Sequence, residues 1–288
     1  MSRFTVIKRL FIKYKNKLIT TYTLFALEML GSLMRPYFVG EAVNDLIKGS
    51  YRGLFSLAFV HCAYLIIGTI RHRYDTRTYS SIYTEFVTKM LSRGFLSAEV
   101  SKLSAHSTLA REFIDFLEYD LNFIVEAMYN IFGALIMLYF YHHSVVIVCL
   151  AVLVPVTIIG YQYGRFIKHL TKSKNDELEK QVDVIATQNN SLINEHYKAL
   201  RHWQVKISDR EAYNFGIMEI LVLVVIVVSL LVVNKSSVLN PAGDIIGIYT
   251  YLLKFVSGLD TIPYILQRLN ILKDITQRIE LEPDISEL

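Results

Sequence analysis

The stretch AMYNIFGALIMLYFYHHSVVIVCLAVLVPVTIIGYQYG, residues 127–164, runs for 38 residues without an aspartate, glutamate, lysine or arginine. A helix needs about 20 apolar residues to cross the hydrocarbon core of a bilayer, so this stretch is too long for one span and suits two. Its one polar interruption is the run YHHS at residues 141–144. We therefore predict a helical hairpin, with one span ending at His142, a very short outer turn, and a return span ending near Arg165.

The segments on either side of this predicted hairpin, residues 71–126 and 165–211, are rich in charge and must share one side of the membrane. Lys and Arg number six in residues 1–17, seven in 71–117 and nine in 165–211, but only three in the opposite loops together. Cytoplasmic segments of membrane proteins carry the excess of basic residues. We therefore predict six spans with both termini on the cytoplasmic side.

The composition also indicates an integral membrane protein. Of the 288 residues, 53% are hydrophobic and 19% are charged, against about 25% charged residues in a typical soluble domain. Little of the chain is left for a soluble domain, and we expect it in the inner (plasma) membrane of a bacterium, in contact with the lipid bilayer. Basic residues alternate with acidic ones along the charged segments, which indicates a solvated surface rather than a nucleic-acid site.

The remaining elements are assigned outward from the hairpin. Basic and apolar residues at helical spacing in residues 1–17 predict a helix that lies in the membrane interface. Before the hairpin, we predict a first span that contains Pro36 at residues 18–40, an outer turn at 48–53 and a long second helix at 54–93. A break at residues 97–107 and a third helix at 109–126 then lead into the hairpin. After the hairpin, we predict an extended charged helix at residues 164–210, a fifth span at 212–234 and an outer loop at 235–243. A sixth span follows at residues 244–266, its helix continues to residue 279, and an acidic tail occupies residues 280–288.

Several short motifs point to a known family. They are PYFVGEAVND at residues 36–45, Ser107-Thr108 followed by FLEYDL at 116–121, EHYKALR at 195–201, Gly243-Asp244, and QRIE at 277–280. Together with the span pattern, they resemble the type-1 transmembrane domain of ABC exporters over nearly the whole chain. Leu109-Ala110 and Ala199 depart from the family pattern, which has Gly-Glu and Gly at these places. The resemblance implies an all-α domain over residues 18–279 with long cytoplasmic helical extensions. It also implies a homodimer in which each second arm, with the fourth and fifth spans, crosses to the partner.

One departure from the family concerns the binding of nucleotides. No G-x-x-x-x-G-K-[ST] motif occurs in the sequence, and that loop is what cradles nucleotide phosphates with backbone N–H groups and a lysine. We therefore expect no ATP hydrolysis by this chain, no catalytic residue and no bound cofactor. No Cys/His pattern typical of a metal site is visible either. The acidic residues 280–288 are expected to close the chain with a polar tail.

The candidate functional residues are ionisable groups within the spans: Glu28, Arg35, Glu219, Lys254 and Asp260. Charged side chains are costly in lipid and usually face a cavity or a partner, so these residues are expected to bind substrate or carry protons. Glu28 and Arg35 lie seven residues apart and share a helix face. The alternative is structural: Glu28 or Glu219 pairs with Arg35 or Lys254 to fix helix packing. Glu219 is the best single candidate for a titrating group, because its own helix has no basic residue within two turns.

The sequence favours a membrane transporter of a peptide or an amphipathic small molecule that works by alternating access. Two hypotheses about the energy source for transport remain. The chain is a stand-alone transporter that uses protons through Glu28, Glu219 or Asp260, by analogy with proton-driven peptide transporters of ABC-exporter-like fold. Otherwise it recruits a separately encoded ATPase subunit through arm tips near residues 97–107 and 172–176. A third hypothesis is a receptor, assembly or immunity protein that keeps the fold without transport.

Overall fold

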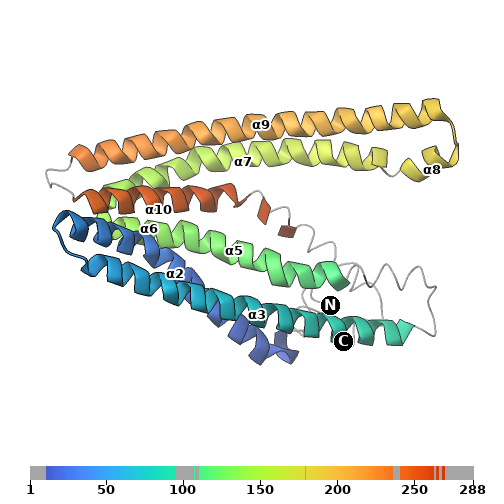
Figure 1. Cartoon of the computed structure of the whole chain (residues 1–288). Coiled ribbons are helices and arrows are strands. Elements are labelled where there is room, and N and C mark those ends of the chain that lie inside the picture. Colours follow the sequence, from blue (N-terminus) through green and yellow to red (C-terminus); the bar gives the residue numbers. More distant parts are fainter. Residues whose placement is uncertain are drawn as a thin grey trace. The chain divides into compact units, whose positions relative to one another are not determined.

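The computed structural model describes residues 11–94, 107, 110–178, 180–235, 241–262, 264–265 and 268–269. These residues form helices joined by short turns, and no strand occurs among them (Figure 1). Most of the predicted interfacial helix, the break at 97–107, most of the second outer loop and the acidic tail lie outside the described residues. Packing divides the chain into two units, which we call unit 1 (Met1–Tyr141 with Leu239–Leu288) and unit 2 (His142–Val238).

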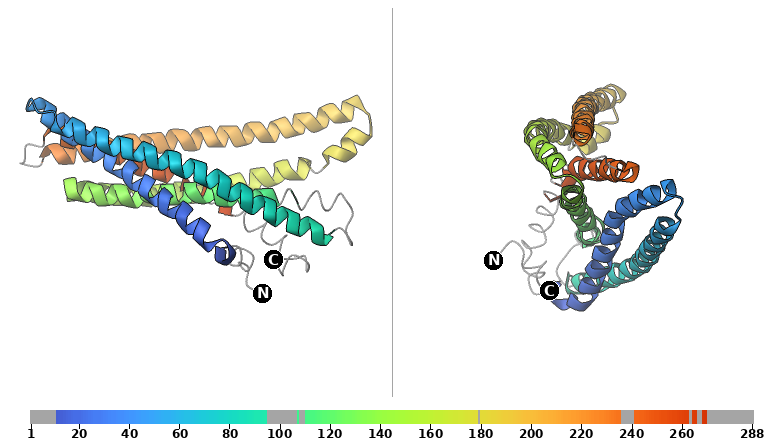
Figure 2. Two further views of the ribbon diagram at one scale, coloured as in Figure 1. Left: turned by 60° about the horizontal axis from the view of Figure 1, so that its bottom comes forward. Right: turned by 90° about the vertical axis from the view of Figure 1, so that its left-hand side faces the viewer.

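The first two helices of unit 1 form an antiparallel pair. Helices α2 (Lys15–Ile47) and α3 (Arg52–Gly94) pack along each other and are joined by a tight turn (Figure 2). Gly49 supplies a positive φ of 74° in this turn, a conformation that suits glycine. The Asp45 carboxylate accepts a hydrogen bond of 2.8 Å from the backbone N–H of Gly53. Helix α3 has 43 residues, or about 65 Å at 1.5 Å per residue, and so confirms the long second helix.

The third helix of unit 1 is continuous from Ala110 to Tyr141 and contains two π-helical turns. Its parts are η1 (Phe116–Asp120), α5 (Leu121–Met128), η2 (Tyr129–Gly133) and α6 (Ala134–Tyr141). The π-turns were not predicted; such turns are rare and often occur at functional sites. The next helix, α7 (His143–Leu178), begins after a single residue, so the predicted helix break at His142 is confirmed.

Unit 2 consists of α7 packed along α9 (Asn190–Lys235), with the short α8 (Gln181–Ala186) between them in sequence (Figure 1). The prediction of one uninterrupted helix over 164–210 is wrong, and so is the arm tip near 172–176. The chain instead reverses at residues 187–189, where Gln188 has a φ of 51°. Asn189 accepts a hydrogen bond from the backbone N–H of Ser191 (2.9 Å) and so starts α9, a common role for Asn at helix starts.

The last described helix of unit 1, α10 (Ala242–Asp260), packs on α2 and on the third helix. Its first turn lies against α2, where a Cβ atom on Gly243 would come within 2.0 Å of the Gly40 carbonyl oxygen. Asn44 joins the two helices, accepting from the Gly243 N–H (2.8 Å) and donating to Asp244 (3.0 Å). Helix α10 starts where the sixth span was predicted, and the predicted continuation beyond residue 269 lies outside the described residues.

Four described helices are long and apolar enough to cross a membrane by length and composition: Arg52–Lys89, Ala110–Tyr141, His143–Ala186 and Asn190–Lys235. Helices α2 and α10 occupy the positions of the first and sixth predicted spans but carry charged residues within them. The total of six spans therefore stays a prediction. Phe55 and Phe59 on α3 are each 76% exposed, as expected of side chains that face lipid.

Candidate functional site

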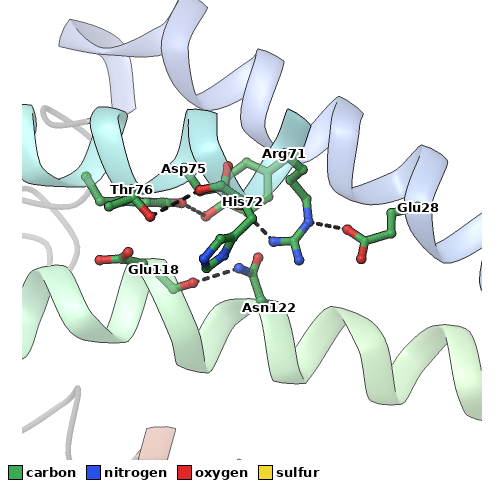
Figure 3. Close-up of polar contacts among 9 residues, drawn as sticks. Glu28, Arg71, His72, Asp75, Thr76, Glu118 and Asn122 are labelled. Atoms are coloured by element: carbon green, nitrogen blue, oxygen red, sulfur yellow. Dashed lines mark hydrogen bonds and ion pairs between the residues drawn. The ribbon is translucent and has the colours of Figure 1, made fainter. Parts of the chain in front are cut away.

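A buried ion-pair cluster joins α2 to α3 in unit 1 (Figure 3). Arg71 on α3 donates through Nε to Glu28 on α2 and through Nη1 to Asp75 Oδ2, the latter at 2.8 Å. The carboxyl side chains of Glu28 and Asp75 are 11% and 7% exposed. Gly68 makes room for this arrangement, because a Cβ atom there would lie 3.0 Å from Glu28 Oε1. We call Glu28, Arg71 and Asp75 the inner cluster.

The inner cluster holds two carboxylates against one guanidinium group. The second carboxylate oxygen of Asp75, Oδ1, is buried and has no hydrogen-bond partner among the described residues. The buried hydroxyl group of Thr21, on α2, lies beside Asp75 and can donate to it, although the two do not form a hydrogen bond of ordinary geometry. A buried carboxylate oxygen without a donor is costly, and a bound proton would remove that cost.

Sequence reasoning placed Glu28 with Arg35, and the structure places it with Arg71 instead. Arg35 turns to α3, where its guanidinium carbon lies 5.2 Å from the centroid of the Tyr64 ring. Arg71 directly follows an apolar run on α3, and Asp75 stands one helical turn beyond it. That i, i+4 pair of opposite charges at the end of a span was the signal in the sequence that could have found the inner cluster.

A second group of polar side chains surrounds the turn of α2 that precedes Pro36. Lys254 on α10 donates to the Ser32 hydroxyl group (3.0 Å), and Tyr251 donates to the Leu33 carbonyl oxygen (2.8 Å). Proline lacks an N–H group and disturbs the helical bonds of the preceding turn, so the Leu33 carbonyl group in that turn can accept an outside partner. The contact with Ser32 places Lys254 beside the turn of α2 that carries Arg35, three residues further along, and the two cations interact electrostatically. We call Arg35 and Lys254 the central cation pair.

The inner cluster and the central cation pair lie at different depths within the predicted spans. Arg35 lies twelve residues before Ile47, and Lys254 lies twelve residues after Ala242. Each is therefore about 18 Å along its helix from the predicted outer surface, near the middle of a hydrocarbon core about 30 Å thick. Glu28 lies seven residues further from the outer end of α2 than Arg35. The inner cluster is thus nearer the predicted cytoplasmic boundary.

A third polar contact fixes the chain after α10. The Asp120 carboxylate, 3% exposed, accepts hydrogen bonds from Tyr264 (2.9 Å) and from Arg268 Nε (2.7 Å). The bond to Asp120 raises the pKa of Arg268 above its usual value, so this arginine stays charged. The three side chains tie the first π-turn of the third helix to the segment that follows α10, which indicates a structural role.

The remaining predicted residues are placed differently. Glu219 lies exposed on α9 in unit 2 and forms no ion pair with another described residue. Asp260 is exposed at the last residue of α10. Of the five predicted residues, the structure therefore brings together Arg35 and Lys254, and it pairs Glu28 with a residue that was not predicted. Among the described residues, no group of three or more His, Cys, Asp or Glu side chains could hold a metal ion.

Comparison with known protein families gives a match over most of the chain. The family model of the ABC transporter transmembrane region matches residues 7–240, which include α2 to α9. Helix α10, which carries Lys254, lies beyond the matched range. A search of curated proteins found no match.

Proposed function

Since the chain belongs to the family of ABC transporter transmembrane regions, we propose that it moves a peptide or an amphipathic small molecule across the membrane by alternating access. It does so as a homodimer and uses a proton gradient. The observation that carries this proposal is the pair of charged groups in the helices of unit 1, the inner cluster and the central cation pair. Ionisable residues in membrane helices are expensive and mark substrate and ion pathways.

The two groups suit different tasks because of their depth and charge. The central cation pair sits near mid-membrane, where substrate sites of transporters commonly lie. The inner cluster lies toward the predicted cytoplasmic side and contains more carboxylate than guanidinium. A carboxylate in such surroundings takes up a proton more readily than one in water, and an arginine nearby opposes this.

We propose Asp75 as the group that binds the transported proton. The charged and titratable groups that face it are Arg71 and Tyr79 on its own helix, Glu28 and Tyr22 on α2, and Glu118 in η1. Only Arg71 among them carries positive charge. The geometry favours Asp75 over Glu219, because Glu219 is exposed within its unit and has no desolvated surroundings there. Glu219 stays the prediction made from the sequence, and experiment separates the two.

Transport itself is tested with purified protein in sealed liposomes. Peptides and amphipathic dyes are presented outside, with and without an imposed pH gradient. We expect uptake of at least one compound class that depends on the gradient and stops when a protonophore dissipates it. Uptake that never exceeds that of empty liposomes for any compound would refute a stand-alone transporter.

A separate ATPase subunit is the second candidate energy source. The family match favours it, because membrane regions of ABC transporters work with ATP-hydrolysing domains. The turn at residues 187–189 ends the described arm of unit 2 and offers a docking point. Gradient-independent transport that appears only on adding an ATPase, and is lost when Gln188 is replaced by proline, would establish this alternative. Gln188→Ala is the matched control, since it keeps a backbone N–H.

The homodimer is tested by chemical cross-linking in native membranes. A six-span domain of this type encloses half of a central cavity, so two copies are needed to complete it. We expect a cross-linked species of twice the monomer mass. Recovery of monomer alone, under conditions that capture a known control dimer, would contradict the proposal.

A further inference from the structure

The central cation pair is not matched by a negative charge among the described residues. Among the described residues, neither Arg35 nor Lys254 has a carboxylate oxygen within 4.0 Å. Arg35 contacts the face of Tyr64, and Lys254 donates to Ser32. Glu126 is the carboxylate that faces Lys254, and it acts on Lys254 only through longer-range electrostatics. Within the described part of the chain, these two cations near the middle of the predicted spans therefore have no carboxylate that forms an ion pair with them.

The position of the pair is fixed by close helix packing. Helix α10 approaches α2 at Gly243 and the third helix at Gly247 and Gly258, where an added Cβ atom would lie within 2.7 Å of a neighbour. Tyr251, one turn before Lys254, holds α10 to the turn of α2 that precedes Pro36. The helix backbones that carry the two cations cannot move apart without breaking these contacts. A rigid scaffold that keeps like charges together is expected where an anion binds between them.

We propose that the central cation pair binds a negatively charged group, a carboxylate or a phosphate, of the transported molecule. Arg35 offers a planar fork of N–H donors that matches two oxygens of such a group, and Lys254 adds a second positive charge. The face of Tyr64 holds the guanidinium group in place for this contact. The inference rests on the proposed transport function and narrows its substrate to organic anions.

The test uses three N-acetylated, dye-labelled tripeptides that are alike except for a central Glu, Gln or Lys. Binding to the purified dimer in nanodiscs is followed by fluorescence anisotropy, and uptake is followed in liposomes. We expect the Glu peptide to bind on the order of tenfold or more tightly than the Gln peptide, because a charge-assisted hydrogen bond is gained. The Lys peptide should bind least, since it meets two like charges.

Variants assign the effect to the pair. Arg35→Gln and Lys254→Gln should each remove the preference for the Glu peptide, whereas Arg35→Lys should keep part of it because the charge remains. Lys48→Gln, in the exposed outer turn, is the matched control and should leave the preference unchanged. Folding of each variant is checked by its elution as a single species with an unchanged melting temperature.

The outcomes separate this inference from the transport proposal. Equal binding of all three peptides, together with gradient-driven uptake, would overturn the anion site and leave transport standing. Preferential binding of the Glu peptide without uptake would support the site and count against transport. A preference for the Glu peptide that is absent in the wild type and appears only in Glu219→Gln would overturn the site, because it would identify the cations as partners of a protein carboxylate.

Discussion

The glycines of the two units meet different surroundings. In unit 1, an added Cβ atom would come within 3.0 Å of a neighbouring side chain or backbone atom at most helical glycines: Gly40, Gly53, Gly68, Gly133, Gly243, Gly247 and Gly258. In unit 2, Gly160, Gly164 and Gly216 meet nothing within 4 Å. Small residues at helix contacts let membrane helices approach closely. Unit 1 is therefore a tightly packed group of helices, whereas the pair in unit 2 leaves its glycines in open surroundings.

The buried polar contacts follow the same division. Unit 1 holds the inner cluster, the central cation pair and the Asp120 contact. In unit 2, the buried polar contact is the one between His196 on α9 and Glu177 on α7, at 2.8 Å, in the charged arm. The difference teaches that the two charged groups of the proposed functional site are held within the tightly packed unit 1. The exposed apolar surface of unit 2 suits contact with lipid or, in the proposed homodimer, with the second copy of the chain.

Removing the arginine of the inner cluster should have the largest effect. Arg71→Met leaves Glu28 and Asp75 buried without a positive charge, which typically costs about 3–5 kcal/mol. We expect a much lower melting temperature in detergent, or no folded protein. The triple variant Glu28→Gln/Arg71→Met/Asp75→Asn should recover most of the loss, since no unpaired charge remains.

The matched change in unit 2 is Arg201→Met, at an exposed position of α9. It should leave the melting temperature nearly unchanged. Equal losses in Arg71→Met and Arg201→Met would show that the burial of the cluster is not what makes Arg71 important.

A glycine pair probes packing without changing charge. Gly243→Ala places a Cβ atom 2.0 Å from the backbone oxygen of Gly40, so the two helices must separate. Overpacking of this kind costs about 1–3 kcal/mol. Gly216→Ala in unit 2 meets open space and should be neutral, or stabilising by up to about 1 kcal/mol, because alanine favours helix. Thermal unfolding of both variants checks this, and a reversed order would refute the comparison of the units.

The contact in the arm of unit 2 should matter less. His196→Ala removes the hydrogen bond to Glu177, which is worth about 1 kcal/mol. Hydrogen–deuterium exchange should become faster near residues 177–200 and stay unchanged in α2 and α3. Faster exchange throughout unit 1 would mean that the arm supports the whole chain.

The smallest effect is expected at the exposed pair of Lys13 and Glu85, 2.7 Å apart. The hydrogen bond to Glu85 is the main cause that raises the pKa of Lys13. A lysine whose pKa is raised on folding stabilises the folded state at pH values below its pKa in the unfolded chain, about 10.4. This stabilisation is lost as the pH rises through the pKa of the folded state. Stability should therefore not change through this pair near neutral pH. Lys13→Ala should cost about 0.2–1 kcal/mol, and less in high salt. A loss that grows with salt would exclude an electrostatic origin.

The sequence predicted those features that depend on local patterns. The helix break at His142, the outer turn around Gly49 and the length of α3 follow from apolar runs, turn residues and the absence of proline. The pairing of Glu28 with Arg71 depends on how α2 and α3 cross, and no pattern within one helix contains that information. The start of α9 was missed because Asn189, within a long charged segment, was not considered as a helix cap.

Proton uptake during transport tests the central claim most directly. Liposomes that contain a pH-sensitive dye and the purified protein receive a transported compound outside, and internal acidification is recorded. Our account predicts acidification by the wild type and by Glu219→Gln, and none above background by Asp75→Asn that is folded and dimeric. Acidification by Asp75→Asn at the wild-type rate, or its loss in Glu219→Gln, would contradict the assignment of the proton site to the inner cluster of unit 1.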